Sequence, residues 1–127
     1  MAAQRNSRDA DPRHVLGAQG EALAESHLRN LGYKLLARRF STPVGEIDLV
    51  MRDAGAIVFV EVKSLRSDRW SDPESRVTPA KQRKLQSAAE WYLNRHRLAA
   101  RAVRFDVVAA VIPENGDPQI VHFPDAF

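Results

Sequence analysis

The sequence predicts an α/β domain whose elements follow the order helix, strand, strand, strand, helix, strand, strand. Two observations lead to this prediction. Apolar residues recur at helical spacing in residues 13–31 and again in residues 78–97. Short β-branched and apolar runs bounded by turn residues fill residues 33–63, and two more follow the second helix at 103–112 and 119–123. A helical crossover places its two flanking strands parallel, so the sheet should be mixed.

Length and composition limit the class of protein. A chain of 127 residues makes one domain; residues 1–12 carry mixed charges without an apolar pattern, so we expect a disordered tail followed by a single domain over 13–127. The absence of cysteine excludes disulfides and thiolate metal sites. No apolar run reaches the roughly 18 residues of a membrane span, and the start lacks a signal-peptide pattern, so we expect a cytoplasmic protein without membrane contact.

The charge balance suggests a class of partner. The net charge is +3 and arginine far outnumbers lysine, which favours bidentate contacts to phosphate if the partner is a nucleic acid.

The first helix carries one carboxylate in an unusual place. Glu21 lies beside the apolar stripe, because its i+3 and i+7 neighbours are Ala24 and Leu28. A carboxylate there needs an arginine, a lysine or a metal ion as partner. The alternative is a glutamate stabilised near the helix N-terminus by the helix dipole.

Residues 45–51 and 56–63 should form an antiparallel hairpin around the turn at residues 53–55. The expected register places four polar side chains on one face by making these pairs: Arg52 with Ile57, Val50 with Phe59, Asp48 with Glu61, and Glu46 with Lys63. In the strand before the hairpin, alternation predicts that Arg38 and Arg39 point to opposite faces.

The hairpin's charged cluster points to metal chemistry. Like charges on opposed residues destabilise a strand pair, and a divalent cation between Asp48 and Glu61 would remove that cost because Mg²⁺ prefers carboxylate and backbone oxygens. Lys63 lies two residues beyond Glu61, where its ammonium could orient a water or neutralise charge on phosphate. The alternative is that Lys63 only bridges Glu46 or Glu61 in a solvated edge strand.

Two regions after the hairpin could bind phosphate. Residues 64–77 form a long predicted loop with basic residues around an aromatic, namely Arg66, Arg69, Trp70 and Arg76. A tryptophan in such a loop can instead pin the loop to the surface. Thr78 and Pro79 then begin the second helix. Lys81 near its N-terminus could bind phosphate, or could be a surface lysine whose stem covers apolar side chains.

In the strand at 103–112, Arg104 and Asp106 share a face, so we expect a structural ion pair near the end of the sheet.

The motifs together resemble a known family. Asp48 followed by Glu61-Val62-Lys63 is similar to the D…(D/E)-x-K signature of the PD-(D/E)xK nuclease superfamily. The stretches at residues 17–21, 45–49, 59–63 and 104–108 look like the bacterial YraN family, grouped with that superfamily and with Holliday-junction resolvases. The resemblance covers about residues 13–112, with Ile47 where the superfamily often has proline.

The resemblance implies a restriction-endonuclease-like core and a site that binds Mg²⁺ or Mn²⁺. Asp48, Glu61, the carbonyl of Val62 and Glu21 would hold the metal, and Lys63 would assist catalysis. Lys81 would join the site from the second helix, and a homodimer is expected by analogy with resolvases.

We therefore expect a metal-dependent endonuclease-like hydrolase that cleaves phosphodiester bonds, with DNA rather than RNA as the expected partner and branched or recombination and repair intermediates as candidate substrates. The sequence does not distinguish branched from linear DNA or endonuclease from exonuclease action. One alternative is a nucleic-acid-binding module or assembly partner that keeps the fold without turnover. Another is an interaction protein in which Glu46, Asp48, Glu61 and Lys63 form only a salt-bridge network.

Overall fold

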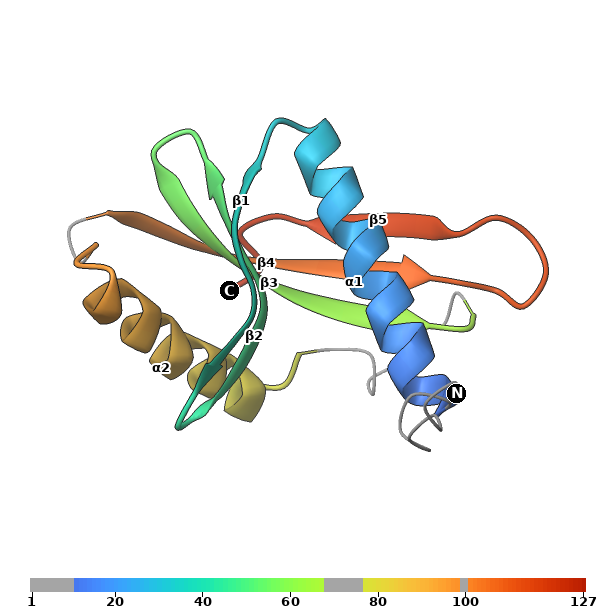
Figure 1. The fold of residues 1–127 in the computed structure, drawn as a ribbon, viewed down its shortest axis with the longest axis horizontal. Coiled ribbons are helices and arrows are strands. Elements are labelled where there is room, and N and C mark those ends of the chain that lie inside the picture. Colours follow the sequence, from blue (N-terminus) through green and yellow to red (C-terminus); the bar gives the residue numbers. More distant parts are fainter. Residues whose placement is uncertain (1–10, 68–76, 99–100) are drawn as a thin grey trace, which may run out of the picture.

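The computed structural model describes residues 11–67, 77–98 and 101–127. Two helices and five strands follow one another in the predicted order (Figure 1): α1 (Pro12–Asn30), β1 (Lys34–Thr42), β2 (Gly45–Asp53), β3 (Ala56–Leu65), α2 (Pro79–Arg95), β4 (Ala102–Val111) and β5 (Gln119–Phe123). No helix in these ranges is long and apolar enough to cross a membrane.

The strands form one sheet in the order β1-β2-β3-β4-β5. Strands β3 and β4 are parallel, and every other neighbouring pair is antiparallel. The mixed α/β sheet is therefore confirmed. Helix α2 supplies the crossover, because two neighbouring parallel strands cannot be joined by a tight turn.

The ends of α1 follow standard capping chemistry. The side chain of Asp11 accepts a hydrogen bond from the backbone N of Arg13 at 2.9 Å, so the helix begins at Pro12, one residue earlier than predicted. Of the predicted tail over residues 1–12, these two positions belong to the start of α1, and residues 1–10 lie outside the described residues. At the other end Gly32 has φ of +97°, and the backbone N of Tyr33 donates to the carbonyl of Leu28 at 3.0 Å, as in a Schellman motif.

Helix α2 begins as predicted. The hydroxyl of Thr78 accepts from the backbone N of Lys81 at 3.1 Å, and Pro79 occupies the first helical position. The helix ends at Arg95, two residues before the predicted end. Its inner stripe is confirmed by the residues that are buried: Leu85, Ala88, Ala89 and Tyr92.

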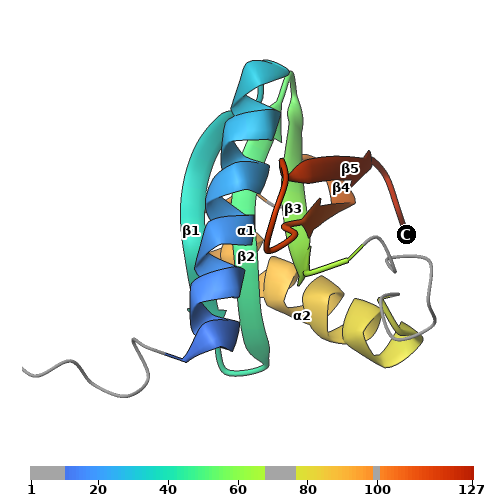
Figure 2. The same ribbon diagram turned by 90° about the vertical axis from the view of Figure 1, so that its right-hand side faces the viewer.

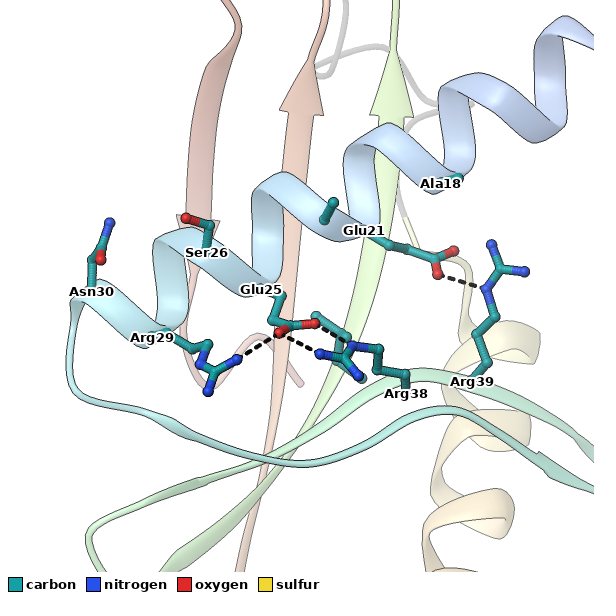
Figure 3. Close-up of a pocket in the computed structure, with 10 residues that line it drawn as sticks. Ala18, Glu21, Glu25, Ser26, Arg29, Asn30, Arg38 and Arg39 are labelled. Atoms are coloured by element: carbon teal, nitrogen blue, oxygen red, sulfur yellow. Dashed lines mark hydrogen bonds and ion pairs between the residues drawn. The ribbon is translucent and has the colours of Figure 1, made fainter.

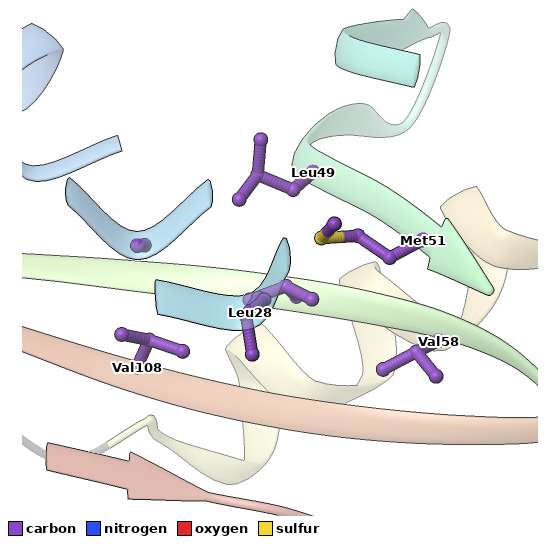
Figure 4. Close-up of a cluster of buried hydrophobic side chains, with 7 residues drawn as sticks. Leu28, Leu49, Met51, Val58 and Val108 are labelled. Carbon is purple, nitrogen blue, oxygen red and sulfur yellow. The ribbon is translucent and has the colours of Figure 1, made fainter. Parts of the chain in front are cut away.

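The two helices cover opposite faces of the twisted sheet (Figure 2). On the α1 face, Leu28 packs with side chains from three strands, including Met51, Val58 and Val108 (Figure 4). On the α2 face, Phe59 and Tyr92 belong to a second buried cluster, with their rings 5.7 Å apart. Successive side chains of β3 thus pack alternately into the two cores, which explains why its residues Ile57 to Val60 are all buried.

Helix α1 touches the sheet most closely at Gly20. A Cβ atom built at this residue would lie 1.8 Å from Oγ of Ser64 and 2.8 Å from its Cβ. Glycine is therefore required for the helix to lie this close to β3. Ser64 and Leu65 belong to β3, where they pair with Ala110 and Val111. Their assignment to the loop was wrong, because pairing with β4 prolongs the strand.

The predicted ion pair between Arg104 and Asp106 is confirmed, with Nε 2.9 Å from Oδ1. Asp106 is completely buried. Its carboxylate also accepts a hydrogen bond from the backbone N of Asp125 at 3.0 Å, and it lies 2.7 Å from Nε2 of His122. Burial alone would raise the pKa of Asp106, but the hydrogen bonds from Arg104, the Asp125 backbone and His122 outweigh it and hold that pKa below 3.8.

Arg104 also joins the start of β1 to the β2–β3 turn. It donates to Oδ2 of Asp53 at 3.0 Å and to the hydroxyl of Tyr33. The sheet therefore carries a paired polar cluster around the buried Asp106 on its α1 face.

Candidate metal and phosphate site

The candidate site lies where β2 and β3 separate. Their pairing runs from Asp53–Ala56 to Leu49–Val60 and includes two of the predicted pairs, Arg52–Ile57 and Val50–Phe59. Beyond this point Oδ2 of Asp48 accepts a hydrogen bond from the backbone N of Val62 at 2.8 Å. The predicted ladder pairs of Asp48 with Glu61 and Glu46 with Lys63 do not form, because the Asp48 side chain takes the place of a backbone acceptor.

Asp48 and Glu61 nevertheless lie together. Burial, the charge of Glu61 and a hydrogen bond between the two carboxyl groups together raise the pKa of Asp48 to about 8, and they outweigh the Val62 N–H, which lowers it. Without a cation, the pair therefore holds a proton at neutral pH. Two carboxyl groups in this arrangement offer several oxygen ligands in one place.

Glu61 is paired with a cation from α2. Only 5% of its side chain is exposed, and its Oε2 lies 3.2 Å from Nζ of Lys81, a side chain that is 46% exposed. Lys63 follows two residues later on the same side of β3 and is half-buried. Glu46 accepts a hydrogen bond from the hydroxyl of Ser41 on β1 at 3.1 Å.

Glu21 points toward β1. Its Oε1 lies 2.9 Å from Nε of Arg39, and one helical turn later Glu25 is held by Arg38 at 2.6 Å and by Arg29 at 3.0 Å (Figure 3). Both neighbouring arginines of β1 therefore reach α1, and the prediction that they point to opposite faces is wrong. The reason is the backbone of Arg39, whose φ of +49° interrupts the alternation of the strand.

A groove of about 620 Å³ lies between α1 and β1. Glu21, Arg39 and Leu49 line it, together with Glu25 and Arg38 farther along the helix. Leu49 directly follows Asp48 in β2, but the carboxylate pair itself does not line the groove. Its walls carry both charges, and Figure 3 shows the paired side chains pointing toward one another.

The predicted phosphate-binding residues fall into two groups. Lys81 lies at the site through its contact with Glu61. Arg66 donates to the carbonyl of Ile112 at 3.3 Å at the end of β4, so its guanidinium has a structural partner. The remaining residues lie outside the described residues: Arg69, Trp70 and Arg76.

One charged residue at the site was missed from sequence. The sequence predicted only that Arg38 and Arg39 point to opposite faces and did not single out Arg39, although the register places Arg39 opposite Asp48, between the pairs Arg38–Leu49 and Phe40–Ile47. Counting residues back from the hairpin would have indicated this neighbourhood. The left-handed backbone that turns Arg39 toward Glu21 has no signal in the sequence.

The side chains of the described residues do not form a complete set of metal ligands. Over the described ranges, no group of three or more His, Asp or Glu side chains is arranged to hold a metal ion. The carboxylate pair Asp48–Glu61 is in place, whereas Glu21 is held by Arg39. The carbonyl of Val62 also faces β2 at this point. The N–H and C=O of one strand residue point to the same side of the strand, and the N–H of Val62 donates to Asp48.

The comparisons with known proteins all lead to one family. The model of the uncharacterised protein family UPF0102 matches residues 20–110, a range that contains Glu21, Asp48, Glu61, Lys63 and Lys81. A UPF0102 protein of Anaeromyxobacter dehalogenans is 45% identical over 120 residues, covering 94% of this chain and 88% of that protein. A UPF0102 protein of Geotalea uraniireducens is 40% identical and covers 95% of each chain.

A third relative, from Syntrophotalea carbinolica, is 44% identical over 113 residues, covering 88% of this chain and 90% of its own length. The range matched by the family model contains the C-terminal half of α1, all of α2 and the strands β1, β2 and β3. The chain therefore belongs to the uncharacterised UPF0102 family, the YraN-like family that its motifs resembled.

Proposed function

We propose that this protein is a Mg²⁺- or Mn²⁺-dependent nuclease that hydrolyses phosphodiester bonds of DNA in the cytoplasm. The observation that carries the proposal is the contact between the carboxyl groups of Asp48 and Glu61 at the point where β2 and β3 separate. A partly buried carboxyl pair is costly for a fold, and a hard divalent cation is the ligand that best offsets this cost.

The residues present fit such a cation. Asp48 and Glu61 would hold it, with the carbonyl of Val62 and the carboxylate of Glu21 as further oxygen ligands. All four groups are oxygen donors, which suits Mg²⁺ and Mn²⁺ and disfavours softer metals. When bound, the cation would polarise the phosphate and lower the pKa of a water molecule.

The side chains around the pair have separate roles in the proposal. Lys63 would stabilise the charge that develops on phosphate, since it lies on the Glu61 side of β3 and is half-buried. Lys81 would contact a phosphate of the bound strand, because it is exposed and near the N-terminus of α2. The loop residues Arg66, Arg69, Trp70 and Arg76 would extend this surface, and a homodimer would present two such sites.

The proposal is tested by cleavage of labelled branched, single-stranded and duplex DNA in Mg²⁺ or Mn²⁺. We expect cutting by the parent protein and a loss of at least about 100-fold in Asp48→Ala and Lys63→Ala. Lys84→Ala is a matched control, because it removes an exposed lysine of α2 that lines a surface pocket with neither Asp48 nor Glu61. Calorimetric titration with Mn²⁺ gives a second readout, in which Asp48→Ala should lose binding.

One observation favours a second function, a nucleic-acid-binding module without turnover. Glu61 and Glu21 already have cationic partners in Lys81 and Arg39, so the site is largely neutralised without a metal ion. Such a module would bind DNA in a salt-dependent way, would cut none of the substrates, and would bind equally well in the parent and in Asp48→Ala. That combination of results would replace the nuclease proposal.

A further inference from the structure

Arg39 is held at the site by an unusual backbone. Its φ of +49° lies within strand β1, and a left-handed conformation costs a non-glycine residue of order 1 kcal/mol. Among the described residues, the other non-glycine positions with positive φ lie in turns or at a helix end: Ala54, Arg97 and Asp125. The strained residue therefore lies directly opposite Asp48 in the sheet.

The guanidinium of Arg39 lies among carboxylates of the candidate site. The hydrogen bond to Glu21 raises its pKa most, and the charges of Glu21, Glu46 and Asp48 contribute further. Its contact with Glu21 is made through Nε at 2.9 Å. More than half of the Arg39 side chain, 55%, is exposed to solvent, so the fork of its terminal N–H groups remains accessible to a phosphate.

We propose that Arg39 is a phosphate-binding residue of the site that exchanges between Glu21 and the substrate phosphodiester. Without ligands it neutralises Glu21. When a phosphate binds the guanidinium of Arg39 in place of Glu21, Glu21 becomes free to join Asp48 and Glu61 around a divalent cation. Binding of the metal ion then increases the affinity for nucleic acid and the reverse, because both require the ion pair between Arg39 and Glu21 to open. This inference rests on the proposed function for the role of the cation.

The energies allow such an exchange. A half-exposed ion pair contributes about 0.2–1 kcal/mol, which is small compared with a charge-assisted contact to phosphate or a carboxylate–metal bond. The structure also pairs each site carboxylate with a separate group, since Lys81 holds Glu61 and the Val62 N–H holds Asp48. Only the Arg39 pair has to open for Glu21 to move toward the carboxylate pair.

The first experiment measures Mn²⁺ affinity by calorimetry without nucleic acid. In Arg39→Asn we expect affinity to rise about 1.5- to 5-fold, because the competing ion pair is lost; asparagine tolerates the left-handed backbone, so the strand should be preserved. Arg39→Lys should remain near the parent. Arg38→Asn is the matched control, since it removes the same charge one position away, from a pair with Glu25. Equal gains in both asparagine variants, or no gain in Arg39→Asn, would overturn the proposal.

The second experiment measures affinity for a short DNA duplex in EDTA, so no metal enters the result. Glu21→Gln releases Arg39, and we expect tighter binding with a salt dependence steeper by about one phosphate contact. The double variant Glu21→Gln/Arg39→Asn should lose the steeper salt dependence. If the double variant keeps it, the gain comes from removing a negative charge and Arg39 makes no phosphate contact.

The two experiments distinguish failure of this inference from failure of the proposed function. A parent protein that binds DNA but no Mn²⁺ contradicts the metal-dependent nuclease, while the EDTA arm still decides whether Arg39 binds phosphate. A parent that binds and cuts DNA, with no change in Arg39→Asn or Glu21→Gln, overturns only the role of Arg39. Absence of both metal and DNA binding overturns both.

Discussion

The carboxylate of Asp48 accepts the backbone N–H of Val62 at 2.8 Å and so occupies the position where a strand partner would lie. The same carboxyl group contacts Glu61, and burial with this neighbour raises the pKa of Asp48 to about 8. One side chain thus ends the β2–β3 ladder and creates the candidate site.

Asp48→Asn should stabilise the metal-free protein at pH 8.5 by about 1–3 kcal/mol. The amide oxygen keeps the bond from Val62 N, while the repulsion from Glu61 is removed. Urea unfolding of the parent and the variant in EDTA measures the difference. Asp117→Asn, at an exposed position, is the control and should change stability little; a destabilised Asp48→Asn would contradict the carboxyl-pair description.

The stability of the metal-free parent should fall as the pH rises from about 4 to 8. In this range the folded chain keeps the proton on Asp48, whereas the unfolded chain, with a pKa of 3.8, has lost it. Unfolding therefore releases a proton, so this contribution is complete below pH 3.8 and is lost by about pH 8. Difference curves between the parent and Asp48→Asn isolate the contribution, and parallel curves would refute it.

Asp106→Asn should destabilise the fold by about 3–5 kcal/mol at pH 7. The change removes the anion that Arg104 contacts through Nε and leaves Asp53 as its remaining carboxylate, in a cluster where Asp106 is completely buried. Because the Asp106 pKa is lowered, the parent should lose this advantage as the pH falls below 3.8. Thermal unfolding at pH 7 and pH 3 measures both effects, and a loss below about 1 kcal/mol would show that the cluster is dispensable.

Two alanine substitutions in α1 should have opposite effects. Gly20→Ala should cost about 1–3 kcal/mol, because the new Cβ would meet Ser64 and push the helix off β3. Gly17→Ala should stabilise by up to about 1 kcal/mol, since open space surrounds that position and alanine favours the helix. The double variant Gly20→Ala/Ser64→Gly should recover part of the loss. Equal effects at both glycines would disprove the close contact.

Lys81→Ala should weaken binding to duplex DNA and reduce the salt dependence by about one contact. In EDTA at pH 8.5 it should also lower stability by up to about 1 kcal/mol, because Glu61 loses its cationic partner while Lys81 is itself 46% exposed. Fluorescence anisotropy over a salt series provides the measurement. Lys84→Ala changes the net charge equally, and identical slopes in both variants would argue against a specific contact.

The fold was predictable because the capping residues and the pattern of apolar residues indicated the same helices and strands. The Thr78–Pro79 start of α2 and the apolar run of β3 each follow from short-range chemistry. The site was predictable as a neighbourhood, since Asp48 and Glu61 do meet. Its details depend on tertiary geometry: the ladder stops before Asp48 because a side chain replaces a backbone acceptor, and Arg39 turns to α1 through a backbone conformation that strand alternation cannot anticipate.

The sheet order has a consequence for how the chain folds. Strands β1, β2 and β3 are joined by short turns, whereas β4 must close a long segment before it can pair with β3. The contact between Asp48 and Glu61 is built only from the early, local part. We expect pulsed hydrogen exchange to protect β2 amides before β4 amides, so that Asp48 and Glu61 come together before β4 joins the sheet.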